Sequence, residues 1–153
     1  MTKRKLLSKK EIKELNEIVS KYAISFEKKA KIEIVDEKWY FIERELMFFV
    51  KDGIIIPSLK WQLRQGICFQ TATIDMGAIK FVVGGADIMR PGIVDVPLAA
   101  KKGDFVTVID EQNQKPLSIG ILLFEGSEIA EMKSGRVIQN IHYIGDELWN
   151  KSL

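Results

Sequence analysis

The sequence is poor in the residues on which many catalytic and metal sites depend. It has one cysteine, Cys68, and one histidine, His142, among 153 residues. A single cysteine excludes an internal disulfide and a cysteine-rich zinc site. Cys68 lies between Ile67 and Phe69, which fits a small packed side chain better than a nucleophile. His142 lies inside a predicted strand and fits a packed structural residue better than a catalyst.

Recognisable catalytic motifs are also missing. The sequence contains no P-loop, and Gly84-Gly85 is predicted to end a helix, whereas a dinucleotide fingerprint opens one. The acidic residues are scattered, so spacing identifies neither paired general acid and base carboxylates nor metal ligands. Carboxylates from distant positions can still meet in space. We therefore expect a protein that is not an enzyme and that uses no cofactor and no metal.

Long hydrophobic runs are absent. No apolar stretch approaches the roughly 18–20 residues that span a bilayer, and Leu6-Leu7 is followed at once by polar and charged residues, unlike a signal peptide. With 46% hydrophobic and 29% charged residues, the chain can still bury a core. Its length fits one ordinary domain or two small ones. We expect a cytoplasmic protein without a membrane partner.

The net charge of +2 hides an uneven distribution. Residues 1–31 hold ten Lys or Arg against four Glu, whereas residues 72–150 hold seven Lys or Arg against eleven Asp or Glu. The basic N-terminal part could approach a phosphate backbone. The C-terminal part could bind RNA only through a local cationic spot and its shape.

The N-terminal part predicts a helix followed by strands. Ser8 and Glu11 form a capping box, and apolar residues then recur at helical spacing. The outer face of this helix carries lysines, which suit either a solvated face or a strip that contacts RNA. Strands are predicted over 31–35, 39–42, 46–51 and 54–56, with a hairpin at Asp52-Gly53. A short helix over 58–65 and a connection over 66–71 follow.

The pattern changes at Ala72. A short strand over 72–74 meets Asp75, which is a good N-cap for a helix through about Val83. Further strands are predicted over 93–96, 105–109, 117–124 and 136–144, with a second helical turn capped by Ser127. Short strands with two brief helices indicate a small β-barrel.

Residues 72–150 resemble the PUA domain, which is named for pseudouridine synthases and archaeosine transglycosylases. The resemblance is carried by Gly77-Ala78-Ile79-Lys80, Gly84-Gly85-Ala86 and Pro91-Gly92-Ile93, and it continues through Lys102-Gly103-Asp104 and Ser134-Gly135-Arg136. These blocks occur in the order and at the separations of that family.

A narrower resemblance covers nearly the whole chain. DMGAIKFVVGGADIMRPGI and IQNIHYIGDELW are similar to the malignant T-cell-amplified-sequence family of translation factors and its archaeal relatives, and residues 32–59 are similar to the pre-PUA domain of that family. The resemblance implies an α+β pre-PUA domain over 1–71 and a PUA pseudo-barrel, mainly β with two short helices, over 72–153. It implies a non-enzymatic RNA-binding protein that acts on the tRNA acceptor end, on small-subunit ribosomal RNA, or on both. A translation-factor protein partner, known for the eukaryotic members, is left open.

The resemblance also implies where RNA binds. In PUA domains RNA lies across the first helix, the glycine loop and the following strand. Carried over to this chain, the RNA-binding residues are Gly77, Lys80, Gly84, Gly85, Ala86, Met89, Arg90, Pro91, Gly92, Ile93, Lys133 and Arg136.

The residue types suggest how each part would act. Glycines let a nucleotide approach the backbone, Lys80 and Arg90 can neutralise phosphates, and Met89 and Ile93 offer apolar surface to an unstacked base. Each has a structural alternative: Met89 as core, Arg90 as a structural cation, and the glycine pair as a helix stop.

Two other functions compete with this one. The apolar segments Phe48-Phe49 and 54–56 suggest a protein-interaction adaptor in which RNA contact is secondary, although a hairpin core explains them more simply. An RNA-modifying enzyme would need a catalytic domain within about 70 N-terminal residues that hold no histidine, which argues against it.

Overall fold

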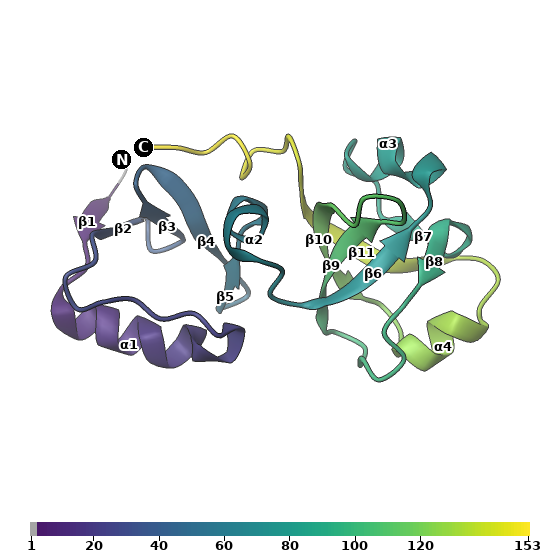
Figure 1. The fold of residues 1–153 in the computed structure, drawn as a ribbon, viewed down its shortest axis with the longest axis horizontal. Coiled ribbons are helices and arrows are strands. Elements are labelled where there is room, and N and C mark those ends of the chain that lie inside the picture. The colour runs from purple at the N-terminus through teal and green to yellow at the C-terminus, as the bar shows by residue number, and fades with distance from the viewer. Residues whose placement is uncertain (1–2) are drawn as a thin grey trace.

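The computed structural model describes residues 3–153, which form two units joined side by side (Figure 1). The N-terminal unit is a five-stranded antiparallel sheet with two helices, and its strands follow the order β1-β2-β3-β4-β5. Its elements are β1 (Arg4–Leu6), α1 (Lys9–Val19), η1 (Ser20–Tyr22), β2 (Ile32–Val35), β3 (Trp39–Ile42), β4 (Glu45–Lys51), β5 (Ile54–Pro57) and α2 (Leu59–Gln65).

The C-terminal unit is a six-stranded sheet that curls into a nearly closed barrel, with strand order β7-β11-β10-β9-β6-β8. Its elements are β6 (Gln70–Ile74), η2 (Met76–Ala78), α3 (Ile79–Val82), β7 (Ile88–Met89), η3 (Arg90–Gly92), β8 (Ile93–Asp95), β9 (Phe105–Asp110), β10 (Pro116–Leu122), α4 (Gly126–Glu131) and β11 (Arg136–Tyr143). The two units together confirm the expected α+β domain followed by a PUA-type pseudo-barrel.

Local sequence signals explain the starts of several elements. The hydroxyl of Ser8 accepts a hydrogen bond from the Glu11 N–H, and the Glu11 carboxylate accepts one from the Ser8 N–H, which confirms the capping box of α1. Asp52-Gly53 forms the turn between β4 and β5, with Asp52 at a φ of 50° and Gly53 at 78°. Ser58 caps α2. The capping box and the Asp52-Gly53 turn need no tertiary contact, which is why sequence reasoning found them.

Other elements differ from the sequence prediction. The short strands β1 and β7 were not predicted, and β6 begins at Gln70, two residues earlier than expected. The helix after Asp75 begins as a 3₁₀ turn and becomes α-helical only at Ile79. The predicted cap at Ser127 was wrong, because Glu125 caps α4 through a capping box with Glu128.

The seam between the two units is both apolar and polar. Buried side chains from β4, β5, α2 and β10 meet there: Phe49, Ile56, Leu59 and Ile119. The buried Thr107 hydroxyl of β9 donates a hydrogen bond of 2.6 Å to the Gln62 side-chain oxygen of α2. The two units are therefore packed through a common core.

The C-terminal segment after β11 returns to the N-terminal sheet. Figure 1 shows this yellow segment crossing from the barrel toward β3 and β4. Leu148 and Leu153 pack with the buried Phe41 and Leu46, and the Leu153 N–H donates to the Arg44 carbonyl at 3.1 Å. The segment therefore ties the barrel to the first unit.

The sheet segment that suggested a protein-interaction surface is core. Phe48, Phe49 and Ile56 are all less than 4% exposed, and of that segment Ile54 is exposed. Among the helices of residues 3–153, none has the length and apolar character that crossing a bilayer requires.

Candidate nucleic-acid interface

A concave surface of about 480 Å³ lies beside α3, and we call it the α3 groove. It is lined by Asp75, Gly77, Ala78, Phe81, Val82, Ala86, Asp87, Ile88, Met89, Pro91 and Gly92. Two large apolar side chains at the groove are open to solvent, since Phe81 is 60% exposed and Met89 is 50% exposed. A solvent-exposed aromatic ring and thioether beside a hollow can accept the face of an unstacked base.

Asp75 fixes the first wall of the groove. Its carboxylate accepts a hydrogen bond of 2.8 Å from the Ala78 N–H, which caps the 3₁₀ turn. Its own N–H donates to the Gly92 carbonyl at 3.0 Å, so the start of the helix is tied to the η3 bend. Gly92 packs so closely on this helix that a Cβ at position 92 would lie 3.2 Å from the Ala78 methyl group. Close contacts between the start of the helix and the η3 bend therefore fix this wall of the groove.

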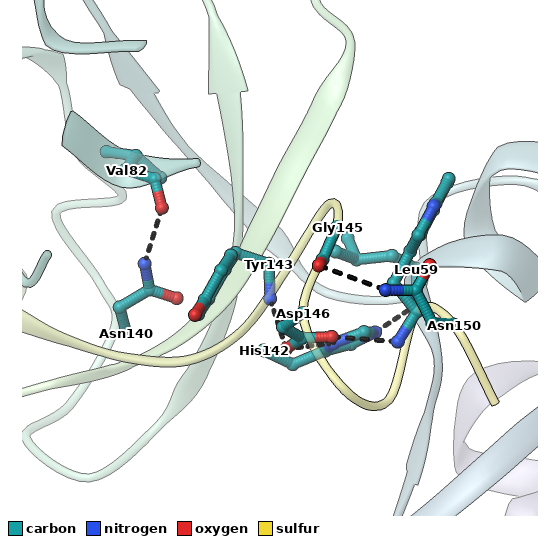
Figure 2. Close-up of polar contacts among 9 residues, drawn as sticks. Leu59, Val82, Asn140, His142, Tyr143, Gly145, Asp146 and Asn150 are labelled. Carbon is teal, nitrogen blue, oxygen red and sulfur yellow. Dashed lines mark hydrogen bonds and ion pairs between the residues drawn. The ribbon is translucent and has the colours of Figure 1, made fainter. Parts of the chain in front are cut away.

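The glycine loop forms the next part of the surface. Gly85 has a φ of +97°, and a Cβ at that position would lie 2.9 Å from the Tyr143 hydroxyl oxygen. Both the conformation and the close approach of Tyr143 thus require glycine. The Asn140 side-chain NH₂ donates to the Val82 carbonyl at 3.0 Å (Figure 2). It also donates to the Ala86 carbonyl at 3.0 Å and so holds the loop against β11.

The charged groups around the groove are partly engaged. The Lys80 ammonium is exposed and lies 5.1 Å from the centre of the Phe81 ring. Arg136 forms an ion pair of 2.9 Å with Asp87, whose other oxygen accepts the Asn140 N–H. Arg136 therefore brings less free positive charge than its type suggests, whereas Lys80 is available to a ligand.

Arg90 points away from a ligand-binding role in this structure. Its guanidinium donates to the carbonyls of Ile129 at 2.6 Å, Ile93 at 3.2 Å and Ala130 at 3.3 Å. Ile129 and Ala130 lie in the last turn of α4, where carbonyl oxygens have acceptor positions left over; the Ile129 carbonyl also accepts the Met132 N–H at 3.1 Å. This geometry favours the structural alternative for Arg90.

The remaining predicted residues fall into three groups. Gly77, Ala86, Met89, Pro91 and Gly92 line the α3 groove, whereas Gly84 and Gly85 are not part of the lining and directly precede Ala86 in the chain. Ile93 is 8% exposed and packs in the barrel core, so it offers no surface to a base. Lys133 is exposed but is not part of the groove lining.

Sequence reasoning missed the exposed ring of Phe81. The core positions of this helix, Ile79, Val82 and Val83, leave Phe81 on the opposite face at helical spacing. An aromatic residue on the outward face of a helix was therefore the available signal. Asp87 gave no comparable signal, because its partners Arg136 and Asn140 lie about 50 residues away in the sequence.

His142 belongs to the seam and not to the α3 groove. It is 1% exposed, its Nδ1 lies 2.9 Å from the Asp146 carboxylate, and its Nε2 accepts the Leu59 N–H at 3.2 Å (Figure 2). Nε2 accepts and Nδ1 donates only in the neutral Nδ1–H tautomer. His142 is thus a packed structural residue, as its sequence context indicated.

Two other titratable groups have shifted pKa values. Burial raises the pKa of Asp146, but hydrogen bonds from His142 and from the Trp149 and Tyr143 N–H groups outweigh it, so the pKa lies below its ordinary value. Burial raises the pKa of the half-buried Cys68 thiol to about 11, which disfavours the reactive thiolate. Over residues 3–153, no three His, Cys, Asp or Glu side chains gather as metal ligands would.

The class of protein follows from two matches to family models. The PUA domain model matches residues 70–144, and a model described as a domain of unknown function, DUF1947, matches residues 3–65. The two matches correspond to the barrel unit and to the sheet unit with α1 and α2. The chain is a PUA-domain protein with a preceding DUF1947 domain.

Curated relatives identify the family more closely. An uncharacterized protein of Methanocaldococcus jannaschii is 38% identical over 97% of this chain and 96% of its own length. Translation machinery-associated protein 20 of Saccharomyces cerevisiae is 38% identical over 82% of this chain and 75% of its own length. Malignant T-cell-amplified sequence 1-B of Xenopus laevis is 33% identical over 71% of this chain and 62% of its own length. The chain belongs to the family of translation machinery-associated protein 20 and malignant T-cell-amplified sequence proteins.

Solved structures show the same arrangement. A conserved PUA domain protein of Thermoplasma acidophilum superposes with a TM-score of 0.80 at 28% identity, over 95% of this chain and 97% of that one. A PUA domain protein of Aeropyrum pernix superposes with a TM-score of 0.81 at 27% identity, over 97% of this chain and 90% of that one. Both likenesses extend over the two units together.

Proposed function

We propose that this protein is a non-enzymatic RNA-binding protein of the translation apparatus and that it works in the cytoplasm. Membership in a translation-associated family supports the setting. The observation that carries the RNA-binding role is the α3 groove, where exposed Phe81 and Met89 meet the glycine loop beside Lys80, which forms no ion pair within residues 3–153. Such a surface suits one or two unstacked nucleotides with few phosphate contacts.

The proposed RNA is the single-stranded acceptor end of tRNA, small-subunit ribosomal RNA, or both. A free 3′ end can place an unpaired base over Phe81 while its phosphate lies near Lys80. A double helix could not enter a groove of about 480 Å³ without separating its strands. The proposed contacts are the groove-lining Gly77, Ala86, Met89, Pro91 and Gly92, the Gly84 and Gly85 that precede Ala86, and Lys80, with Lys133 and Arg136 at its periphery.

The test compares the full chain with the Lys80→Ala/Phe81→Ala variant. We expect the variant to bind a tRNA acceptor-stem hairpin with a single-stranded 3′ end about ten-fold or more weakly, since stacking contributes about 1–3 kcal/mol per base. Fluorescence anisotropy measures this. Lys115→Ala/Leu98→Ala is the matched control, because both residues are exposed and lie outside the groove. Equal affinities for the variant and the control would rule out the α3 groove.

The same experiment separates the two classes of RNA. Acceptor-stem hairpins with and without the single-stranded end, and small-subunit RNA fragments, are measured in parallel. Loss of binding when the end is removed supports acceptor-end recognition. Tight binding to subunit RNA alone assigns that target instead.

A further inference from the structure

A second groove lies on the N-terminal unit, between α1 and the chain segment that follows η1. Its volume is about 670 Å³, and we call it the α1 groove. It is lined by Lys9, Lys10, Ile12, Lys13, Asn16, Phe26, Glu27 and Lys28. Figure 1 shows α1 at the end of the molecule away from α3, so the two grooves are separate surfaces.

Hydrogen bonds and aromatic contacts hold both walls of the α1 groove in place. The Asn16 side chain makes two hydrogen bonds to the backbone of Phe26, one from its NH₂ to the carbonyl at 2.9 Å and one from the Phe26 N–H at 2.8 Å. The Phe26 ring packs edge-on against Phe48 and Trp61, with ring centres 6.2 Å and 5.9 Å apart. Both walls are thereby fixed to the core.

The charge of the α1 groove is strongly positive. Lys9, Lys10, Lys13 and Lys28 are exposed, and in the described part of the chain none of them forms an ion pair. Glu27 is the acidic member of the lining. Three other basic side chains of this unit do form ion pairs: Arg4 with Glu33, Lys5 with Glu11, and Arg64 with Glu45. The four lysines therefore leave a positive potential that attracts a polyanion.

The floor of the groove is apolar. Ile12 is 2% exposed and the partly buried Phe26 lies beside it. Lys9 and Lys13 are one helical turn apart, about 6 Å along the axis, and so form a row beside this floor. A cationic row that follows a backbone, next to an aromatic ring on which a base can rest, is the arrangement of surfaces that bind single-stranded nucleic acid.

We propose that the α1 groove is a second RNA-binding site, which takes a single-stranded segment with its phosphates on Lys9, Lys13 and Lys28 and a base against Phe26. The site does not depend on the α3 groove. A chain with both sites holds two RNA segments at opposite ends of one packed body.

The test counts binding sites with a six-nucleotide oligouridylate on the full chain. Native mass spectrometry gives the stoichiometry, and anisotropy at several salt concentrations gives the affinity. We expect two oligonucleotides on the wild-type chain and one on the Lys9→Ala/Lys13→Ala/Lys28→Ala variant. The affinity of the lost site should fall about ten-fold or more, and the salt slope should fall by roughly 2, at about 0.7 per phosphate contact for single strands.

Two matched variants isolate the local effect. Lys101→Ala/Lys102→Ala/Lys115→Ala removes the same charge from exposed positions outside both grooves and should keep two sites. Lys9→Arg/Lys13→Arg/Lys28→Arg should keep the second site because the charge is retained. Equal loss in the alanine variant and the charge-matched control would overturn the proposal.

The remaining outcomes are equally decisive. A polyglutamate peptide is tested in parallel. If the Lys9→Ala/Lys13→Ala/Lys28→Ala variant loses binding of this peptide but keeps both RNA sites, the α1 groove is assigned to an acidic protein partner and the proposal is overturned. Loss of one site in the α1 variant, with no change in the Lys80→Ala/Phe81→Ala variant, would support the α1 groove and contradict the proposed function of the α3 groove.

Discussion

Arg90 joins three segments of the barrel through one side chain. Its guanidinium donates to carbonyls of α4 and to Ile93, its near neighbour at the start of β8. Lysine at this position could keep the charge but could not reproduce the planar fork that reaches three carbonyls. For holding these segments together, the planar shape of the Arg90 guanidinium therefore matters more than its charge.

We expect Arg90→Lys to lower the free energy of unfolding by about 1–3 kcal/mol, because three part-buried carbonyls would lose the hydrogen bonds that the guanidinium donates. Urea unfolding followed by circular dichroism measures this change. Lys80→Ala, at an exposed position, should change it by less than about 0.5 kcal/mol. Wild-type stability of Arg90→Lys together with weakened RNA binding would instead make Arg90 a direct RNA contact.

Asp146 predicts a pH dependence of stability. Its pKa is held below the ordinary value, so the ionised carboxylate stabilises the fold at pH values above that ordinary value. This contribution is lost as the pH falls through the folded-state pKa. We expect Asp146→Asn to be less stable at neutral pH and to lose less stability than the wild type between about pH 5 and pH 2.

Urea titrations at a series of pH values check this expectation. Asp95→Asn is the control, since Asp95 is exposed and makes no side-chain hydrogen bond among residues 3–153. Parallel pH profiles for the wild type and Asp146→Asn would show that the carboxylate does not stabilise the fold.

At the scale of elements, the returning C-terminal segment joins what the chain order separates. Leu148 and Leu153 pack with buried residues of β3 and β4, and the Lys151 ammonium lies 4.0 Å from the centre of the Trp39 ring. These contacts involve positions more than 100 residues apart. Part of the core of the first unit therefore depends on packing contacts with the last residues of the chain.

We expect Leu148→Ala to lower the free energy of unfolding by about 2 kcal/mol, at the low end for leucine truncations because the side chain is partly exposed. Amide exchange should increase in β3 and β4 and not only near position 148. Glu147→Ala, whose side chain is 91% exposed, is the neighbouring control. Faster exchange limited to residues after β11 would mean that the segment only rests on the sheet.

Local signals and distant partners explain what the sequence could and could not predict. Ser8 with Glu11, Asp52-Gly53 and the cap at Asp75 act within a few residues, so these elements were predicted correctly. The strands β1 and β7 have two or three residues and exist through pairing with β2 and β11, which no short pattern encodes.

The candidate site shows the same division. The glycine loop and the helix before it were located from their residues, and the groove was found there. The partners of Arg90 and Asp87 were not, because Ile129, Ala130 and Asn140 lie about 40 to 50 residues away. Burial of Ile93 likewise depends on how the barrel closes.

At the scale of the whole molecule, the buried seam predicts that the two units unfold together. Leu59 and Gln62 of α2 are bonded to His142 and Thr107 of the barrel, and the apolar cluster draws from both units. We expect one cooperative transition with equal calorimetric and van't Hoff enthalpies. Thr107→Val, which leaves the Gln62 oxygen with only its longer hydrogen bond from the Cys68 N–H at 3.3 Å, should destabilise both units equally by about 0.5–1.5 kcal/mol.

Differential scanning calorimetry and tryptophan fluorescence check this cooperativity. Trp39 and Trp61 report on the first unit, Trp149 reports on the C-terminal segment at the seam, and circular dichroism reports on the whole chain. Two separated transitions, or a fluorescence midpoint that differs from the circular dichroism midpoint, would show that the units fold independently.

Cys68 stands in the segment that links α2 to β6, next to the seam, and it is the one thiol in the sequence. Because burial raises its pKa, alkylation of the closed molecule should be slow, and any motion that parts the two units should speed it. The reactivity of Cys68 is thus a built-in probe of whether the two units separate. Reaction rates with a small maleimide, measured with and without RNA, would report whether binding opens or tightens the joint without any introduced label.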